Sequence, residues 1–314
     1  MTKMTKNEAE RVEKRVIAVV ALLLLAVAPV TAERHALIFG LGKQEDTRWG
    51  QIHGDNDVLY VKQMLFRMGY TDIRVLTNEQ ATKAGMVNAF VDLALRCKRG
   101  DEVYVHYSGH GQLMTDLDGD EALKWDNGHA EWDEAWIPYD AYMTYGPEDH
   151  GEKHFCDDEV ALFLQAIRQK IGHRGRLVVV VDACHSGDAT AAGEEEEECV
   201  RGVDTKFNIP RDPNAPQVKE LTEEEWRTVS ACKPHQLSTE IKERQVGKLT
   251  FALFSLNASP FEMDNGELEQ QLTEFMERHR GRLTQTPMVT GKVRNEREKS
   301  EKSWLQIDKD FFNR

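Results

Sequence analysis

The chain has 314 residues, a mass of 35.9 kDa and a formal net charge of −14 at pH 7. Hydrophobic residues make up 40% of it and charged residues 30%, which excludes global disorder and allows one large domain or two small ones. The excess of Asp and Glu argues against binding to nucleic acids or to anionic lipid, because both depend on clustered Lys and Arg.

Residues 1–32 differ in character from the rest of the chain. Five basic residues precede an uninterrupted apolar run at 16–28, and small or β-branched residues follow it as far as Ala32. This order is typical of a secretory signal peptide that is cleaved after Ala32. The apolar run is shorter than the roughly 20 residues that span a bilayer, although acidic residues in the basic region leave an uncleaved signal anchor open. We therefore expect a secreted or periplasmic protein without stable membrane insertion after cleavage.

Strands and helices alternate in the next part of the chain. Short apolar runs rich in β-forming residues predict strands at 36–39, 73–76, 102–107 and 177–181. Apolar residues at helical spacing predict helices at 55–68, 82–98 and 157–171. Asp55 is the expected N-cap of the first helix. Strands that alternate with helices in this way form a parallel sheet covered by helices on both faces.

The remaining segments are less regular. Residues 112–156 are acidic and rich in Trp, and we expect a loop or hairpin insertion there. Residues 188–222 hold a run of five Glu and three Pro, a composition that predicts an exposed and mobile linker. The predicted elements after it are a strand at 226–231, helices at 248–257 and 266–280, and a strand at 287–290. A charged tail starts at residue 292.

Two of the predicted strands run directly into unusual polar sequences. The first leads into Ser108-Gly109-His110-Gly111 and the second into Asp182-Ala183-Cys184-His185-Ser186-Gly187. Sites in open parallel sheets form at the carboxyl ends of strands. If the two strands are neighbours, the imidazole of His110 can take the proton of the Cys184 thiol, which is a strong nucleophile only as thiolate.

These two motifs, in this order and each after a predicted strand, resemble the caspase-like cysteine peptidases, in particular the metacaspases and their bacterial relatives. Further matching positions lie at 118–121, 132–134, 137–140, 230–232, Gln236, Glu240, 250–253 and 285–287, so the resemblance covers residues 35–291. It implies an α/β fold, the caspase-like three-layer sandwich with a mainly parallel central sheet and helices on both faces. The implied divisions are a large catalytic part at 33–187, the linker at 188–222, a smaller part at 223–291 that completes the same domain, and the tail at 292–314.

The resemblance also implies catalytic roles. His110 would be the general acid and base, Cys184 the nucleophile, and the backbone amides of Gly111 and Cys184 the oxyanion hole. Such a dyad hydrolyses peptide bonds through a thioacyl-enzyme intermediate. Either side chain alone would more often be structural, as a buried thiol or a hydrogen-bonded turn histidine, but the two motifs together favour catalysis.

The resemblance also predicts the substrate, through two acidic residues. Asp182 matches a pocket acid of metacaspases, which cleave after Arg or Lys, and Asp57 matches a second one. A carboxylate at the floor of a pocket binds a guanidinium or ammonium group through charge-assisted hydrogen bonds. The alternative for Asp57 is a helix-start residue that complements the macrodipole. We expect protein or peptide substrates with a basic residue before the scissile bond.

The linker carries basic residues at which the enzyme could cleave itself. They are Arg201, Lys206 and Arg211. Members of the family are often cut in this region to become active. A passive, protease-sensitive loop is the alternative.

A group of acidic residues is a candidate calcium site. Many metacaspases require calcium, and Asp116, Asp118 and Asp120 cluster in the insertion. Calcium prefers oxygen ligands, but the spacing does not match an EF-hand, and a solvated acidic loop is the alternative. The chemistry itself requires no cofactor, so calcium would act as an activator.

Two other functions stay open at this point. A catalytically silent caspase-like scaffold would lack His110 or Cys184, whereas both are present. A Cys–His acyltransferase would use the same dyad to pass its acyl group to an amine. Among the five cysteines, Cys199 and Cys232 could pair, and the sequence sets no oligomeric state.

Overall fold

The computed structural model describes residues 32–121, 132–184, 199–211, 225–256 and 259–294. Several sequence expectations fall outside the described residues: most of the leader, residues 185–187 of the cysteine motif, linker residues 188–198 and 212–222, and the tail from 295 onward. In the described part of the chain, no helix combines the length and the apolar character needed to cross a membrane.

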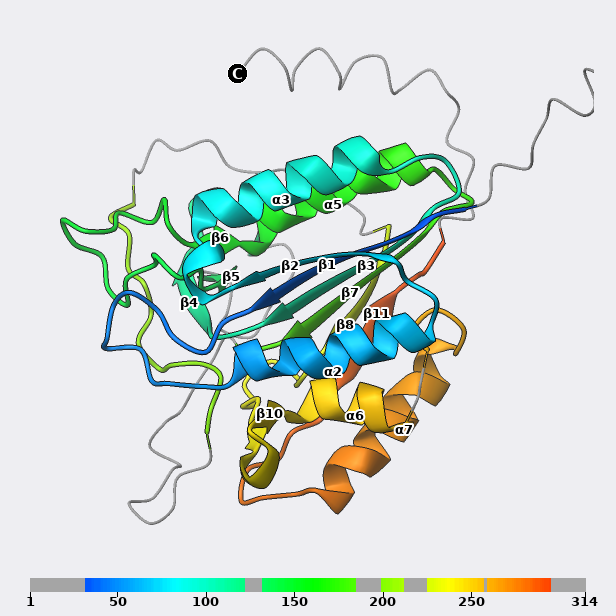
Figure 1. The fold of residues 1–314 in the computed structure, drawn as a ribbon. Coiled ribbons are helices and arrows are strands. Elements are labelled where there is room, and N and C mark those ends of the chain that lie inside the picture. The colour runs from blue at the N-terminus through cyan, green and yellow to red at the C-terminus, as the bar shows by residue number, and fades with distance from the viewer. Residues whose placement is uncertain (1–31, 122–131, 185–198, 212–224, 257–258, 295–314) are drawn as a thin grey trace, which may run out of the picture. The chain divides into compact units, whose positions relative to one another are not determined.

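A six-stranded sheet forms the centre of the described residues (Figure 1). Its parallel strands are β1 (Arg34–Gly40), β2 (Asp72–Thr77), β3 (Glu102–Ser108), β7 (Arg176–Asp182) and β8 (Arg227–Ser230). At one edge β11 (Met288–Gly291) pairs antiparallel with β8. The order β11-β8-β7-β3-β1-β2 makes β3 and β7 neighbours, as the positions of the two motifs require.

The central strands are buried on both faces, which explains their nearly continuous apolar sequences. Successive side chains of a strand point to opposite faces of the sheet. In β1, Ala36 and Ile38 therefore pack into one hydrophobic cluster, and Leu37 and Phe39 into the other. The core thus has two halves, one on each side of the sheet.

Helices cover both faces (Figure 1). α3 (Lys83–Arg96) and α5 (Asp157–Ile171) lie on one face, while α2 (Gly54–Arg67), α6 (Lys248–Leu256) and α7 (Asn265–Arg278) lie on the other. α5 illustrates the cause, because it buries Val160, Leu164, Ile167 and Ile171 along one stripe. This three-layer arrangement confirms the predicted fold class.

The start of α2 differs from the prediction. Asp55 is not its N-cap, because the helix already begins at Gly54, and the carboxylate of Asp55 accepts a hydrogen bond from the side-chain amide of Asn78 at 3.0 Å. A Cβ on Gly54 would lie 2.4 Å from the carbonyl oxygen of Ser108. Only a glycine fits at this position, because the start of α2 lies directly against the end of β3. The N-cap of α3 is Thr82, where its helix was expected to start.

The acidic insertion forms a second, antiparallel sheet. Its strands are β4 (Gly111–Thr115), β5 (Trp132–Trp136) and β6 (Phe155–Cys156). β4 follows His110 directly, so this sheet is attached to the histidine motif. The remaining short elements are the 3-10 helices η1 (Asn78–Gln80) and η3 (Lys242–Arg244) and the paired strands β9 (Glu240–Ile241) and β10 (Val246–Gly247).

The prediction of an exposed linker is wrong for part of residues 199–211. Residues 204–206, 208, 210 and 211 are exposed as expected, whereas other residues of the segment are not. Arg201 and Phe207 are fully buried. The backbone N–H of Phe207 donates to Leu113 at 2.8 Å, and the Phe207 ring joins a cluster that includes Trp49 and Met114. The segment has few apolar residues, which is why the sequence predicted a linker. Backbone pairing with β4 and the ion pairs of Arg201 hold it against the domain instead.

Candidate active site

His110 and Cys184 lie just beyond the carboxyl ends of the neighbouring strands β3 and β7. The last residues of these strands, Ser108 and Asp182, stand opposite each other in the sheet. Both motif side chains are buried, with 2% of His110 and 1% of Cys184 exposed. The topology therefore brings the predicted pair to one edge of the sheet.

The ring of His110 is fixed by a backbone carbonyl and an indole. Its Nε2 lies 2.7 Å from the carbonyl oxygen of Gly50, and its centroid lies 5.3 Å from that of Trp49. A carbonyl only accepts, so Nε2 must carry the proton and Nδ1 the lone pair. Nδ1 has no hydrogen-bond partner among the described residues. His110 can therefore accept a proton at Nδ1. The sequence did not reveal Gly50, because a backbone carbonyl leaves no residue-type signal.

Burial controls the protonation of both side chains. It lowers the pKa of His110 to about 4 and raises the pKa of the Cys184 thiol to about 12. At neutral pH the imidazole is a free base and the thiol keeps its proton. In this state His110 can act as a general base toward the thiol, whereas a thiolate–imidazolium pair is disfavoured.

A segment of the linker occupies the space beside this pair. The carbonyl oxygen of Arg201 accepts hydrogen bonds from the backbone N–H groups of Gly111, at 3.2 Å, and of Cys184, at 3.1 Å. These are the two amides predicted to form an oxyanion hole. A Cβ on Gly202 would lie 2.6 Å from the sulfur of Cys184. The peptide bond between Arg201 and Gly202 thus lies against the thiol, with its carbonyl polarised by two donors.

The residues before Arg201 are held as an added strand. The N–H of Arg201 donates to Ser238 at 2.9 Å, and the N–H of Glu240 donates to the carbonyl of Cys199 at 3.1 Å. Val200 pairs antiparallel with Thr239. Strand addition of this kind binds peptides mainly through their backbone and leaves the side chains to set specificity.

Three carboxylates surround the Arg201 side chain. Its Nη1 lies 2.6 Å from Asp57 and 3.7 Å from Asp182, and its Nη2 lies 2.9 Å from Glu240. All four side chains are essentially inaccessible to solvent. Burial alone would lower the pKa of Arg201, but the three carboxylates raise it well above its usual value. The pocket therefore holds a cation by charge-assisted hydrogen bonds.

Hydrogen bonds from the smaller part of the domain build the floor of this pocket. Asp182 accepts hydrogen bonds from the backbone and hydroxyl of Thr250, at 2.8 and 2.7 Å, and from the hydroxyl of Ser238 at 3.0 Å. Asp57 accepts one from the N–H of Gly247 at 3.0 Å. Burial raises the pKa of Asp57 to about 6, although the charge of Arg201 opposes that rise. The structure thus places both predicted acids in one pocket.

Comparisons with known proteins agree with this geometry. Residues 34–192 match the family model described as the metacaspase, peptidase C14 domain. The chain belongs to the metacaspase family.

Two relatives show the extent of the similarity. Metacaspase-1B of Aspergillus oryzae is 33% identical over 171 residues, which cover 51% of this chain and 36% of the relative. Metacaspase-2 of Arabidopsis thaliana is 31% identical over 167 residues, with the same coverage of 51% and 36%. The matched region of this metacaspase spans just over a third of the length of these curated relatives.

Solved structures share the fold. Caspase-1 from Spodoptera frugiperda superposes with a TM-score of 0.50 and 12% identity, over 83% of this chain and 86% of that one. A protein from Geobacter sulfurreducens gives a TM-score of 0.56 and 18% identity, over 84% and 97%. At these identities the likeness confirms the caspase-like architecture.

Glu240 is the pocket acid whose role the sequence did not reveal. It lies in the two-residue strand β9, far along the chain from Asp57 and Asp182. No local pattern marks a side chain that reaches the pocket from so short an element. In the sequence, Glu240 was one of the residues that match the smaller part of the family, without a role in the pocket.

The three basic residues proposed for self-cleavage differ in position. Arg201 is hydrogen-bonded to the backbone of Gly111 and Cys184 and lies in the pocket of carboxylates, as described above. The ammonium of Lys206 instead lies over the ring of Trp132, 4.2 Å from its centroid. Arg211 is exposed at the end of the described segment. Of the three, the structure brings only Arg201 to Cys184.

The acidic residues of the insertion converge as predicted. Carboxylate oxygens of Asp116, Asp118 and Asp120 lie within 4.8 Å of one another, and Asp120 forms a second such group with Glu121 and Asp133. Burial raises the pKa of Asp133 to about 9, and nearby carboxylates add to the rise. Asp116 and Asp133 each keep a buried oxygen without a hydrogen-bond partner in the described residues. Hard oxygen donors with excess negative charge fit a calcium ion.

The cysteines carry no disulfide. All five lie within the described residues and all are free, so Cys199 and Cys232 are not joined. The sulfur of Cys232 lies 3.2 Å from the carbonyl oxygen of Gln236 instead.

Proposed function

We propose that this protein is a cysteine endopeptidase that cleaves peptide bonds after Arg or Lys, with Cys184 as nucleophile and His110 as general base and acid. The observation that carries this proposal is the position of Arg201. Its carbonyl oxygen bonds to the N–H groups of Gly111 and Cys184, while its side chain lies in a pocket of three carboxylates. The chain thus holds a basic residue in the pose that a substrate would adopt.

The reaction begins at the sulfur. As the bond between Cys184 Sγ and the substrate carbonyl carbon forms, Nδ1 of His110 takes the thiol proton. The negative charge that develops on the carbonyl oxygen is stabilised by the N–H groups of Gly111 and Cys184. The carbon–nitrogen bond then breaks, and His110 returns the proton to the leaving amine.

A thioester to the N-terminal fragment remains. Water attacks its carbonyl carbon while His110 takes one proton from the water. The carbon–sulfur bond breaks, the acid product leaves, and His110 gives the proton back to the sulfur of Cys184. The cycle restores the neutral pair that burial favours in the resting state.

The pocket favours Arg over Lys. The guanidinium of Arg201 contacts Asp57 through Nη1 and Glu240 through Nε and Nη2 at the same time. An ammonium group is a point charge without this planar fork, so it satisfies fewer carboxylates at once. An acidic side chain would meet three like charges and would be excluded.

We also propose that the chain is its own first substrate, cut between Arg201 and Gly202. The support is that this bond already lies against the Cys184 sulfur. Residues 199–201 occupy the groove that external substrates need. Their departure after the cut would open the site.

Calcium is the proposed activator, held by Asp116, Asp118, Asp120 and Asp133. Asp116 directly follows β4 and Asp133 lies on β5, and β4 itself begins at the oxyanion donor Gly111. An ion that neutralises these carboxylates would stabilise the sheet that positions Gly111.

Export also stays a proposal, supported by the leader pattern at 1–32. The N-terminal residue of protein recovered outside the cytosol tests it. We expect Glu33, and an N-terminus that retains the apolar run would contradict cleavage after Ala32.

Fluorogenic peptides that end in Arg, Lys or Asp before the reporter group test the main proposal. We expect turnover of Arg peptides, slower turnover of Lys peptides and none of Asp peptides, each measured with and without calcium. Cys184→Ala should abolish all turnover. Cleavage after Asp alone, or activity that survives Cys184→Ala, would contradict the proposed function.

A further inference from the structure

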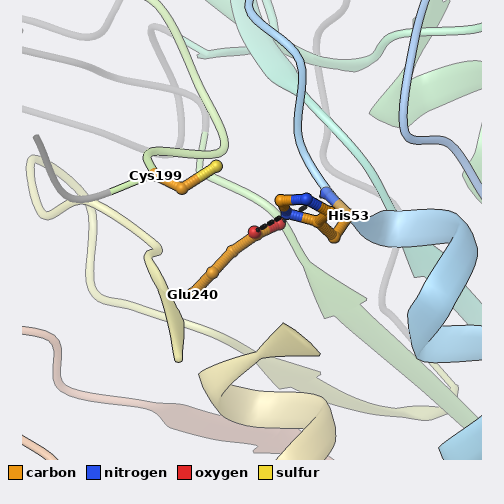
Figure 2. A group of neighbouring side chains, drawn as sticks. All are labelled: His53, Cys199 and Glu240. Atoms are coloured by element: carbon orange, nitrogen blue, oxygen red, sulfur yellow. Dashed lines mark hydrogen bonds and ion pairs between the residues drawn. The ribbon is translucent and has the colours of Figure 1, made fainter. Parts of the chain in front are cut away.

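Three potential metal ligands converge beside the Arg201 pocket (Figure 2). His53 directly precedes α2, Cys199 lies two residues before Arg201, and Glu240 lies in β9. One ligand atom of each residue lies within 4.8 Å of the other two. Glu240 is buried, and the other two residues are half-buried. The three come from separate parts of the chain.

The two oxygens of Glu240 have different partners. Oε1 accepts hydrogen bonds from the guanidinium of Arg201, at 2.9 and 3.1 Å, and from the backbone N–H of His53 at 2.7 Å. Oε2 is hydrogen-bonded to Nδ1 of His53 at 2.6 Å. A cation could therefore bind Oε2 and the imidazole while Oε1 keeps its contacts with Arg201.

The thiol of Cys199 is weakly engaged. Its sulfur donates a long hydrogen bond of 3.6 Å to the carbonyl oxygen of Gln51. The sulfur of Cys199 lies within 4.8 Å of a carboxylate oxygen of Glu240. A cation placed between the two would neutralise the carboxylate and stabilise the thiolate.

The surroundings tolerate a cation despite the nearby guanidinium. Asp57, Asp182 and Glu240 together carry more negative charge than Arg201 neutralises. Ligand bonds of about 2.0–2.1 Å in a tetrahedral site would require His53 Nδ1 and Glu240 Oε2 to stand roughly 3.3 Å apart. The His53 side chain is 26% exposed and has room for this shift.

We propose that His53, Cys199 and Glu240 bind a divalent cation of the zinc class and so clamp residues 199–201 in the substrate groove. An imidazole, a thiolate and a carboxylate suit tetrahedral zinc, with water as the fourth ligand. On binding, the sulfur–hydrogen bond of Cys199 breaks, a sulfur–metal bond forms and the proton passes to solvent. Nδ1 of His53 also gives up the proton that it donates to Glu240, and the neutral imidazole carries its proton on Nε2 instead.

The clamp acts on the segment that must leave. His53 and Glu240 belong to the body of the domain, whereas Cys199 precedes the bond to be cut. A bound ion would hold residues 199–201 in place after the cut and keep external substrates out. This consequence rests on the proposed function, whereas ion binding itself does not require catalysis.

Cobalt(II) tests the binding, in Cys184→Ala protein that keeps the chain intact and removes the nucleophilic thiol. A thiolate ligand gives cobalt a charge-transfer band in the near ultraviolet, and a tetrahedral site gives visible bands. We expect both bands at one equivalent, their displacement by zinc, the loss of the thiolate band in Cys199→Ser, and binding at least tenfold weaker in His53→Ala.

The matched control is Cys156→Ser. Cys156 lies in another metal-compatible group, with Asp133 and Asp158, and its loss should leave the cobalt bands unchanged. A missing thiolate band in the parent protein, or a band that survives Cys199→Ser, would overturn the proposed site.

Inhibition by zinc tests the clamp in self-cleaved enzyme with an intact Cys184. We expect zinc to reduce turnover of Arg peptides at least tenfold in the parent enzyme, with recovery on chelation, and less than twofold in Cys199→Ser, each relative to its own zinc-free rate. Equal inhibition of both enzymes would place the ion on the catalytic pair and contradict the clamp. A parent enzyme without turnover in the absence of zinc would contradict the proposed function. The cobalt experiment would still test the metal site, because it does not depend on catalysis.

Discussion

The carbonyl oxygen of Arg201 lies 3.1 Å from the backbone nitrogen of Cys184, the residue whose thiol we propose to attack that same carbonyl. The N–H of Gly111 completes the pair of donors at 3.2 Å. Under the proposed function, the linker is bound as a substrate would be before any external peptide arrives. One residue of the chain then contacts both the proposed oxyanion donors and the carboxylates of the pocket.

Substitution of Arg201 should remove self-cleavage at this bond. Arg201→Ala leaves the pocket without its cation, so we expect no cut before Gly202. Arg201→Lys keeps a charge but lacks the planar guanidinium that contacts two carboxylates at once. The loss of one charged hydrogen bond, about 1.5–3 kcal/mol, should slow the cut roughly 10- to 150-fold. Time courses of fragment formation on gels measure both effects.

The control is the double variant Lys206→Ala/Arg211→Ala. Neither residue reaches the pocket in the structure, and self-cleavage should proceed at the parent rate. Unchanged cleavage in Arg201→Ala, or its loss in the double variant, would assign the cut to a different basic residue.

The pocket acid Asp57 should control the use of external Arg peptides. Removal of one charge from a buried ion pair costs on the order of 2–5 kcal/mol, so Asp57→Asn should lower kcat/KM for Arg peptides at least about 30-fold. Asp55→Asn is the matched control two residues away, because Asp55 bonds to Asn78 instead. Similar kinetics for the two variants would argue against Asp57 as a pocket acid.

Gly202 should be required for the pose of the scissile bond. A Cβ there would lie 2.5 Å from the carbonyl oxygen and 2.6 Å from the sulfur of Cys184, so Gly202→Ala must displace the segment. We expect self-cleavage to slow at least about tenfold. Gly266→Ala, in the first turn of α7, meets only Asp264 at 3.4 Å and should cleave normally. Equal half-lives of the two variants would refute the pose.

Calcium should stabilise the protein more as the pH rises. The pKa of Asp133 is raised to about 9 by burial and neighbouring carboxylates, against about 3.9 in an unfolded chain. The folded state therefore holds a proton on Asp133 that the unfolded state lacks, and this group's stabilisation is present below about pH 4 and is lost as the pH rises toward 9. A bound calcium ion would replace the proton as the neutralising charge.

Thermal unfolding of Cys184→Ala protein measures this effect. The increase in Tm on calcium addition should be larger at pH 8 than at pH 5. Asp133→Asn should lose most of the increase at pH 8. An increase that is independent of pH, or one that survives the Asn substitution, would contradict calcium binding at Asp133.

Much of the fold and part of the site could be predicted from the sequence, because the decisive residues follow strands. His110 and Cys184 each follow the end of a predicted strand, so the rules for parallel sheets place them at the same edge of the sheet once the two strands are neighbours, which the strand order confirms. Asp182 ends its strand, and Asp57 belongs to the first helix. Each of these positions is defined by a local pattern.

The rest of the site depends on contacts between distant segments. Glu240 reaches the pocket from a two-residue strand, and Gly50 contributes only a backbone carbonyl to His110. Composition predicted an exposed linker, yet Arg201 is fully buried because three carboxylates compensate the cost of burying its charge. The linker was predicted from its low content of apolar residues, and that content gives no information about backbone pairing or about a buried cluster of charged side chains.

The most direct test of the account is the N-terminal residue of the fragment released by purified protein. Incubation of the parent chain with calcium should yield a C-terminal fragment that begins at Gly202, identified by intact mass and N-terminal sequencing. Cys184→Ala protein should stay uncut. A chain that remains intact, a fragment that begins elsewhere, or the same fragment from Cys184→Ala would contradict the assignment of Arg201 and Cys184 as the bound substrate residue and the nucleophile.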